Sequence, residues 1–281
     1  MNQRQQPHGQ SRDATSRRAD LVAVDIGNST TQVGAFAGET LLADWRVSSA
    51  LDRTADEIRH LLVALAGEAA VDLTGSAAIV CSVVPILTQS FVTALEGASG
   101  RAPWVVDSGL DLGVPIRYLD PSQVGPDRLA NAVAAAERHR LPAIVVDLGT
   151  AITFDVVSAS GEYLGGAIAP GIRTAADALF RRAARLPRVE LELPASAIGR
   201  TTTTSIQSGL VLGAAILIDG LVERIAAELD AAPCVIATGG DAGLVRAACH
   251  AIDVVDPCLT LHGMRLVAGR LARGRPSPTT D

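Results

Sequence analysis

Two acidic turns are the segments whose residue types and spacing best suit the chemistry of phosphates. In each, an apolar run ends in an aspartate, and two residues later a glycine lets the backbone turn tightly. Asp25 opens the first turn and Asp147 the second, 122 residues later (147 − 25 = 122). Hydroxyl, amide and backbone donors after the glycine can wrap a β- or γ-phosphate while the aspartate holds Mg²⁺, directly or through water. A plain hairpin turn has the same composition, but the pair favours a phosphate clamped between two similar halves.

A third acidic residue, Asp127, lies between these turns, where Gly125 and Pro126 precede a predicted helix. The free amides and the dipole of a helix N-terminus favour an ionised carboxylate. Such a carboxylate can accept the proton of a substrate hydroxyl, because phosphoryl transfer requires positioning more than strong basicity. Arg128 can bind a carboxylate or phosphate oxygen. An ordinary helix start with a solvated arginine is the alternative interpretation.

Two glycine-rich segments follow the second acidic turn. Residues 165–171 lie at the end of a predicted strand, where they could line a ligand cleft or simply lead into a helix. Gly239 and Gly240 follow another apolar strand. Paired glycines at a strand end allow a flat ligand to approach the backbone closely, so a nucleoside contact is the hypothesis for this second segment.

The segments around the two acidic turns repeat one pattern. Residues 21–36 and 143–158 each predict a strand, an acidic turn and a second strand. A turn follows in each copy, at Gly38 and Gly161, and then a third strand over 41–47 or 163–169. Two such meanders predict two similar α/β halves. We expect the halves to span residues 21–125 and 126–272.

Helical patterns lie between and after the meanders. Thr54 and Glu57 form a capping-box signature at the start of a predicted helix over 54–69. Further helices are predicted at 126–140, 205–230, 241–250 and 259–272, and further strands at 77–84, 102–107 and 234–240. The polar ends, residues 1–20 and 273–281, are predicted to be disordered.

The composition excludes several classes of protein. The 281 residues are 48% hydrophobic and carry a net charge of −6, which argues against nucleic acid or a membrane surface as a partner. No uninterrupted apolar run approaches the roughly 18 residues that a membrane span needs. The polar N-terminus lacks the apolar middle of a secretory signal. We therefore expect a cytoplasmic protein.

Taken in order, these segments resemble the type III pantothenate kinase family, which belongs to the superfamily of acetate and sugar kinases, Hsp70 and actin. The likeness spans about residues 21–270 and rests on DIGNS at 25–29, WRVSS at 45–49, GPDR at 125–128, DLGTAITFD at 147–155, GGAIAPG at 165–171, IGRTTTTSIQSG at 198–209 and ATGG at 237–240. It implies an α/β fold of two duplicated actin-like (ribonuclease H-like) halves with a nucleotide cleft between them. The implied reaction is ATP-dependent phosphorylation of the primary hydroxyl of pantothenate to 4'-phosphopantothenate, the first step of coenzyme A biosynthesis.

The resemblance also implies roles for the matching residues. Asp127 would be the catalytic proton acceptor, and Asp147 would bind a monovalent cation, K⁺ or NH₄⁺. Asp25 is the candidate ligand of the Mg²⁺ that accompanies ATP. The implied ATP-binding residues are Asp25, Ile26, Gly27, Asn28, Ser29, Thr30, Thr31, Gln32 and Thr150. The implied pantothenate contacts are Tyr118, Gly125, Pro126, Asp127, Arg128 and Thr202.

The family works as a homodimer with its substrate site near the subunit interface, and the apolar helix at 205–229 is the candidate for part of that interface. Three positions depart from the family pattern. Ser29 replaces a threonine but keeps its hydroxyl, and Pro126 removes one backbone N–H. Arg200 stands where the family has lysine ahead of Thr202.

Two other functions remain open at this stage. One is a nucleotide-binding regulatory protein of the same family without kinase turnover. The other is a kinase of the same superfamily that acts on a sugar or a small acid. A substrate panel with ATP distinguishes these from a pantothenate kinase.

Overall fold

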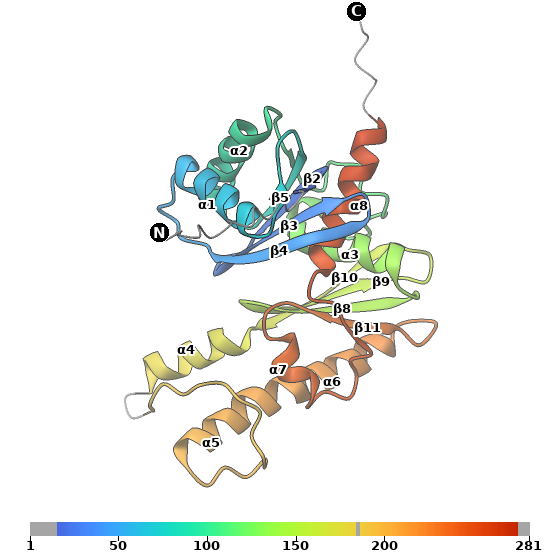
Figure 1. The fold of residues 1–281 in the computed structure, drawn as a ribbon. Coiled ribbons are helices and arrows are strands. Elements are labelled where there is room, and N and C mark those ends of the chain that lie inside the picture. Colours follow the sequence, from blue (N-terminus) through green and yellow to red (C-terminus); the bar gives the residue numbers. More distant parts are fainter. Residues whose placement is uncertain (1–15, 184–185, 275–281) are drawn as a thin grey trace, which may run out of the picture.

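The protein folds into two five-stranded sheets, one in each half of the molecule (Figure 1). The structure is a computed structural model that describes residues 16–183 and 186–274. The first sheet has the order β4-β3-β2-β6-β7, with strands β2 (Leu21–Ile26), β3 (Thr30–Ala37), β4 (Thr40–Ser48), β6 (Ala77–Ser82) and β7 (Trp104–Val105). The second has the order β10-β9-β8-β11-β12, with strands β8 (Ala143–Leu148), β9 (Ala151–Val157), β10 (Tyr163–Pro170), β11 (Cys234–Thr238) and β12 (Val254–Val255).

The two sheets share one topology, as the duplication predicts. In each, the first three strands form an antiparallel meander, and a fourth strand pairs in parallel with the first. The turns at Gly38 and Gly161 both have positive φ, 57° and 79°, which glycine adopts without strain. The prediction of two duplicated α/β halves is therefore confirmed.

Strand alternation decides which side chains face the space between the sheets. Leu21 and Ala23 on β2 join the core that both sheets share, whereas the residues between them pack outward. Asp25 points the same way as Leu21 and Ala23, because side chains alternate in direction along a strand. On β8, Val145 faces the shared core and Asp147 follows it two residues later. Both aspartates therefore project inward from the ends of equivalent strands.

Two central helices, α3 (Pro126–Arg138) and α8 (Leu259–Gly274), lie between the sheets. α3 packs on β8 and β9, and α8 packs on β2, β3 and β6, so α8 crosses back from the second half onto the first sheet. The two helices also pack on each other, so closely that a Cβ at Gly263 would lie 1.9 Å from the carbonyl oxygen of Ala130. The predicted division at residue 126 groups α3 with the sheet it covers, whereas α8 lies on the sheet of the other half.

The outer faces of the sheets are covered by the remaining helices. α1 (Ala55–Glu68) and α2 (Pro85–Ser99) cover the first sheet. α1 begins at the predicted capping box, in which the Thr54 N–H donates to the Glu57 carboxylate at 2.8 Å. α4 (Ile172–Arg182), α6 (Gly213–Ala226) and α7 (Ala242–Arg246) pack on the second sheet. A single 3₁₀ turn, η1 (Pro121–Gln123), precedes α3.

The long apolar helix begins earlier than predicted. α5 (Thr202–Gln207), a π-helical turn at Ser208–Leu212 and α6 follow one another without a break, against a predicted start at residue 205. By length and composition this helix could span a membrane, since it has 25 residues with a mean hydropathy of 1.7, although polar residues interrupt its apolar run. About 33% of the most apolar 18-residue stretch of this helix is buried within the chain. Ile218 and Val222 pack in the core of the second half, which explains part of the apolar character.

Part of the segment predicted to be an N-terminal disordered tail is folded. β1 (Arg17–Arg18) pairs in parallel with β5 (Val71–Asp72), and Ala19 is buried beside them. Residues 17–20 therefore belong to the first half, because Ala19 packs in the core of that half and the backbone of β1 pairs with β5. The rest of the predicted N-terminal tail, residues 1–15, lies outside the described residues, as do residues 275–281.

Candidate active site

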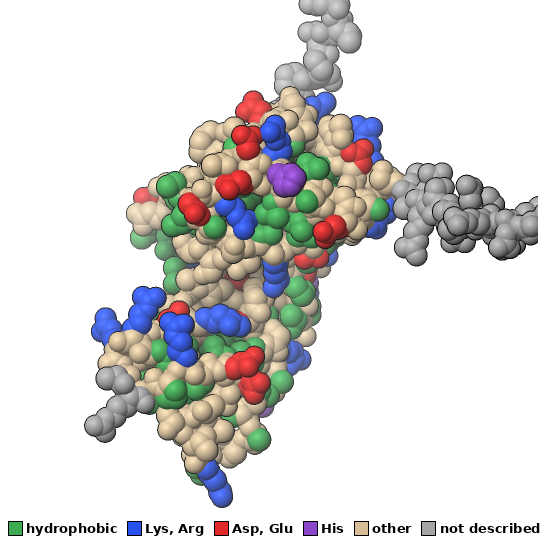
Figure 2. Space-filling view, turned by 60° about the vertical axis from the view of Figure 1, so that its left-hand side comes forward, with side chains coloured by type: hydrophobic (Ala, Val, Ile, Leu, Met, Phe, Trp, Pro, Cys, Tyr) green, Lys and Arg blue, Asp and Glu red, His purple; other side chains and the backbone are tan. Residues whose placement is uncertain are grey.

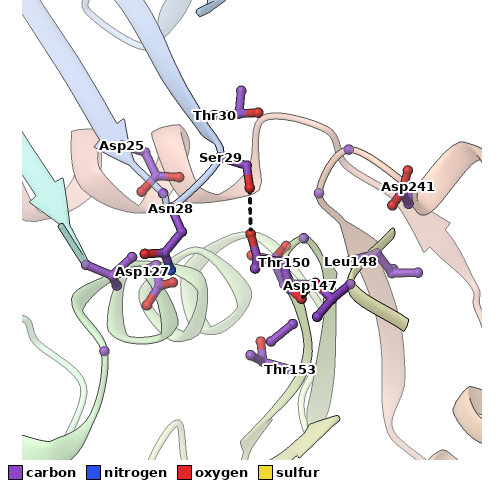
Figure 3. A pocket seen from close by; sticks show the side chains of 18 of the residues that line it. Asp25, Asn28, Ser29, Thr30, Asp127, Asp147, Leu148, Thr150, Thr153 and Asp241 are labelled. Carbon is purple, nitrogen blue, oxygen red and sulfur yellow. Dashed lines mark hydrogen bonds between the residues drawn. The ribbon is translucent and has the colours of Figure 1, made fainter. Parts of the chain in front are cut away.

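A cleft of about 570 Å³ opens between the two halves (Figure 3). Its walls are the turn after β2, the equivalent turn after β8, and the start of α3. Asp25, Asp127 and Asp147 all line it. Three carboxylates that are far apart in sequence thus share one cavity, as a phosphate clamp requires.

The two acidic turns meet across this cleft. The hydroxyls of Ser29 and Thr150 lie 3.2 Å apart, one from each half. Each turn is closed by a backbone hydrogen bond from its glycine N–H, of 3.1 Å for Gly27 and 3.0 Å for Gly149. These short closed turns leave hydroxyls directed at the same space, where an anion can be held from both sides.

Burial raises the pKa of all three carboxyl groups, and the charge of Asp127 adds to the rise at Asp25 and Asp147. Burial raises the pKa of Asp25 well above its ordinary value, and the charges of Asp127 and Asp147 raise it further. Burial, and then the charge of Asp127, raises the pKa of Asp147 to about 6. The pKa of Asp127 is also raised by burial, against the opposing effect of the Arg128 backbone N–H. Because gathered like charges disfavour ionisation unless a cation joins them, these three carboxylates favour a bound cation.

A buried hydrogen-bond chain orients Asp147. The side-chain amide of Asn131, fully buried on α3, donates to Oδ2 of Asp147 at 3.1 Å. The Asn131 carbonyl oxygen accepts from the hydroxyl of Thr260 on α8 at 2.8 Å. A flipped amide would present oxygen to the carboxylate, so both bonds define one orientation. The position of Asp147 is thereby tied to both central helices.

Asp127 lies in the first turn of α3, after Pro126 at the first helical position. Its Oδ1 accepts a hydrogen bond from the Arg128 N–H at 2.8 Å. A Cβ at Gly125 would lie 2.5 Å from the same oxygen, so a side chain there would displace the carboxylate. The N–H that Pro126 lacks would have no partner within the helix at that position, so the proline costs no helical hydrogen bond.

Arg128 lines the cleft but is held from beneath by protein groups. Its Nε donates to Oδ1 of the fully buried Asp155 at 2.7 Å, and its Nη2 donates to the carbonyl of Phe154 at 3.2 Å. The hydroxyl of Tyr163 donates to the same Asp155 oxygen at 3.1 Å, and the guanidinium lies 6.0 Å from the ring centroid of Tyr163. Burial raises the pKa of Asp155 to about 7, while Arg128 opposes that shift.

Most of the predicted ATP-binding residues line the cleft, and two do not. Ile26 is buried in the core beneath α1 and α2, and Thr31 is buried with its hydroxyl 2.9 Å from that of Ser49. Both alternate with cleft-facing neighbours, so their side chains point away from the cleft. The predicted ATP-binding residues in the lining are Asp25, Gly27, Asn28, Ser29, Thr30, Gln32 and Thr150.

The predicted pantothenate contacts divide in the same way. Those that line the cleft are Gly125, Asp127 and Arg128. Pro126 does not reach the lining, and Tyr118 lies beside it, with its ring 3.3 Å from where a Cβ of Gly165 would be. Thr202 is exposed at the start of α5, at the far end of the second half (Figure 1). The structure does not bring Thr202 into the cleft of its own chain.

Several lining residues escaped the sequence analysis. Arg173 on α4 donates to Asp241 at 3.0 Å beside the Gly239–Gly240 turn, which lines the cleft where a nucleoside contact was expected. Arg46 belongs to the WRVSS motif at 45–49, which resembles the family but indicates no role for this arginine. The polar lining residues to which the sequence analysis assigned no role are Arg46, Gln123, Thr153, Arg173, Thr174, Asp177 and Asp241.

The donor groups of the cleft suit hard cations. Carboxylates, hydroxyls and backbone carbonyls are the oxygen ligands that Mg²⁺ and K⁺ take. Within residues 16–183 and 186–274, no group of three or more His, Cys, Asp or Glu forms a ready-made metal cage. Mg²⁺ in phosphotransferases keeps water and substrate phosphates as ligands and needs only one or two carboxylates. Asp25 and Asp147 therefore fit cations that enter with an anionic substrate.

Two duplicated halves that meet at an acidic cleft define the fold of actin-like ATPases and sugar kinases. The activator of the 2-hydroxyisocaproyl-CoA dehydratase from Clostridium difficile, solved with bound ADPNP, has a TM-score of 0.55 at 13% identity over 91% of this chain and 98% of its own. A conserved Campylobacter jejuni protein described as a Baf family transcriptional activator has a TM-score of 0.57 at 18% identity over 90% and 100%. At such identities the likeness shows the fold alone, and it confirms the predicted actin-like class.

The sequence comparisons narrow this class to one family. The type III pantothenate kinase model matches residues 21–224. The type III pantothenate kinase of Moorella thermoacetica is 47% identical over 251 residues, 89% of this chain and 99% of the relative. That of Acidothermus cellulolyticus is 47% identical over 253 residues, 89% and 98%. The chain belongs to the type III pantothenate kinase family.

Proposed function

We propose that this protein is a cytoplasmic pantothenate kinase, which transfers the γ-phosphoryl group of ATP to the primary hydroxyl of pantothenate in the first step of coenzyme A biosynthesis. The observation that carries the proposal is the meeting of Asp25, Asp127 and Asp147 in one cleft between duplicated halves. Membership of the family supports the choice of substrate.

Residues of both halves hold the reactants. The turns at 27–30 and 149–150 bind the phosphates through N–H groups and hydroxyls, with Ser29 and Thr150 on opposite sides. Asp127 orients the pantothenate hydroxyl and accepts its proton as the oxygen bonds to the γ-phosphorus and the bond to ADP breaks. Burial raises the pKa of Asp127, which makes it a stronger proton acceptor than a solvated aspartate. Asp25 would hold the Mg²⁺ that accompanies ATP, and that ion would offset the charge of the phosphates.

We assign the monovalent cation, K⁺ or NH₄⁺, to Asp147. Two observations support this role: the carboxylate is oriented by Asn131 from a fully buried position, and it adjoins the phosphate turn at Thr150. A cation there compensates a carboxylate whose pKa is raised to about 6, and it adds positive charge beside the phosphates.

Pantothenate would lie along the glycine pair of β10. A Cβ at Gly165 would touch the ring of Tyr118, and a Cβ at Gly166 would lie 3.3 Å from Nη2 of Arg128. Tyr118 and Arg128 therefore flank one stretch of strand that carries no side-chain bulk. The fixed guanidinium of Arg128 suits the carboxylate of pantothenate.

A homodimer would account for Thr202. The second half exposes large apolar side chains, with Ile168 66%, Ile198 79% and Ile216 71% exposed. Figure 2 shows hydrophobic side chains on the surface of this half, the lower one in that view. An interface over this surface would bury the exposed side of the 202–226 helix and would carry Thr202 of one subunit toward the cleft of the other. The pantothenate site would then be completed across the interface.

The decisive test is a coupled assay of ADP release with pantothenate, run in sodium and then in potassium. We expect release that depends on both pantothenate and potassium. ATP binding without pantothenate-dependent turnover would support the regulatory function instead, and turnover with a sugar or small acid alone would support another kinase of the fold.

The shared site has its own test by subunit mixing. Asp127→Ala and Thr202→Arg variants, each inactive and each shown to be dimeric by light scattering, are unfolded, mixed and refolded together. If Thr202 serves the opposite subunit, half of the dimers contain one intact site, and about a quarter of normal activity returns. If Thr202 acts within its own subunit, no activity returns.

A further inference from the structure

We propose that Arg46, to which no role has been assigned, binds the polyphosphate chain of the nucleotide from the first half. The inference rests on the proposed function, since it concerns the ATP of that reaction. Two observations support it: the pairing of residues between neighbouring strands in each sheet, and the charges of the arginines that line the cleft.

Equivalent rows of side chains face each other across the cleft. In the first sheet, Asp25 pairs with Gln32 on β3, and Gln32 pairs with Arg46 on β4. Paired residues on neighbouring strands project from the same face, and all three line the cleft. The row therefore continues from the acidic turn out to the edge strand, where it ends in a guanidinium.

The second sheet repeats the row with different chemistry at its end. Asp147 pairs with Thr153 on β9, and Thr153 pairs with Ile168 on β10. Ile168 is 66% exposed, and it lines the cleft at the position equivalent to Arg46. At the ends of these two rows, the duplicated scaffold thus places a cation in the first half and an apolar side chain in the second. A phosphate chain in the cleft would meet positive charge from the first half and the Gly239–Gly240 turn from the second.

Arg46 reaches across the cleft to that turn. Its Nη2 donates to the carbonyl of Pro257 at 3.4 Å, and its Nη1 lies 3.9 Å from where a Cβ of Gly240 would be. A nucleotide whose phosphates lie between the acidic turns and whose nucleoside lies at Gly240 would pass directly under this guanidinium.

The other cations of the cleft are already paired. Among the described residues, Arg128 forms a buried ion pair with Asp155, and Arg173 pairs with Asp241, whereas no carboxylate of the described chain lies within ion-pair distance of Arg46. Arg46 is exposed to the cleft. The sequence also contains no lysine, so all 24 of its basic residues are arginines. Among the described arginines that line the cleft, Arg46 is therefore the one without a carboxylate partner, and its charge is available to the phosphates.

The test uses the full-length protein and a series of ligands that differ only in phosphate number. Binding of Mg²⁺ with ATP, ADP, AMP and adenosine is measured by calorimetry for the wild type and Arg46→Gln, without pantothenate. We expect the affinity for ATP and ADP to fall roughly 10- to 100-fold, as for loss of a charge-assisted hydrogen bond, and the affinity for adenosine to stay unchanged. Arg46→Lys should lose less affinity for ATP and ADP, because lysine keeps the positive charge but lacks the forked guanidinium group.

Arg59→Gln is the matched control, because Arg59 lies on α1 outside the cleft in an exposed pair with Asp56. Its ATP affinity should equal that of the wild type, and all variants should have similar melting temperatures. In steady state, Arg46→Gln should raise the KM for ATP and leave the KM for pantothenate unchanged.

An equal loss for adenosine and ATP would overturn the proposal, because it would indicate contact with the nucleoside or a purely structural role. Unchanged ATP affinity would overturn it as well. Wild-type protein that binds ATP but does not phosphorylate pantothenate would instead contradict the proposed function, and the ligand series would still decide the role of Arg46.

Discussion

Replacing Asp147 by asparagine should stabilise the empty protein at alkaline pH while abolishing its activity. Burial and the nearby Asp127 raise the pKa of Asp147 to about 6. A carboxyl group with a raised folded-state pKa stabilises the fold fully only below its unfolded pKa. That contribution is lost as pH rises through the folded-state value, because ionisation is easier in the unfolded chain. The Asp147→Asn variant carries no charge, so it escapes this loss.

The size of the effect follows from the pKa shift. The difference between about 6 and the ordinary 3.8 corresponds to about 3 kcal/mol above pH 7 and to roughly half of that at pH 5. This is an upper limit, because Asp147 borders the solvent of the cleft. Asn131 can still donate to the new amide oxygen, so its hydrogen bond survives. The melting temperature should rise by about 5–10 °C at pH 8 for a chain of this size.

The assay is thermal unfolding of the wild type and Asp147→Asn between pH 4.5 and 8.5 in a buffer with choline as the only added cation. The advantage of the variant should grow with pH and should shrink when potassium is added, since only the wild type has a carboxylate for the cation. A difference in melting temperature that is the same at pH 5 and pH 8 would refute the reasoning.

Three further predictions concern neighbouring groups. Asp127→Asn should lower kcat by a factor of ~100 or more without lowering the melting temperature, and near-normal turnover would remove Asp127 from the mechanism. Asp155→Asn should lower the free energy of unfolding by about 3 kcal/mol in urea, because Arg128 would be left buried without its partner; an unchanged midpoint would contradict this account. Gly263→Ala should destabilise by about 1–3 kcal/mol through its clash between α3 and α8, whereas Gly67→Ala, in open space on α1, should be neutral or stabilising.

The parts of the site that could be predicted from sequence are those that local rules determine. Asp25 and Asp147 each follow a continuous apolar strand and precede a glycine turn, so strand parity gives the two side chains equivalent directions. Asp127 follows Gly125 and a proline that is typical of a first helical turn. These signals lie within a few residues of each carboxylate, and the duplication then places the two turns opposite each other.

The remaining parts depend on contacts between distant segments. The hydrogen bond from Thr260 to Asn131 joins two helices 129 residues apart in sequence, and no local pattern announces it. The ion pair of Arg128 with Asp155 is buried only because α3 lies on the sheet of the second half. Thr202 was assigned on motif order, which does not show where the following helix points. Motif order therefore identifies chemistry more reliably than it identifies the cavity that a residue enters.

The duplication also explains why the cleft is asymmetric where it matters. Two equal halves would offer an anion the same environment on both sides, with carboxylates at Asp25 and Asp147 and no way to distinguish the ends of the substrate. The far ends of the two rows differ, because the first half has the positive charge of Arg46 there and the second half has the apolar side chain of Ile168. Asp127 comes from a central helix and not from either of the paired turns, and in the proposed reaction it would mark the position of the acceptor hydroxyl. The direction of phosphoryl transfer would then be set by residues outside the repeated motif.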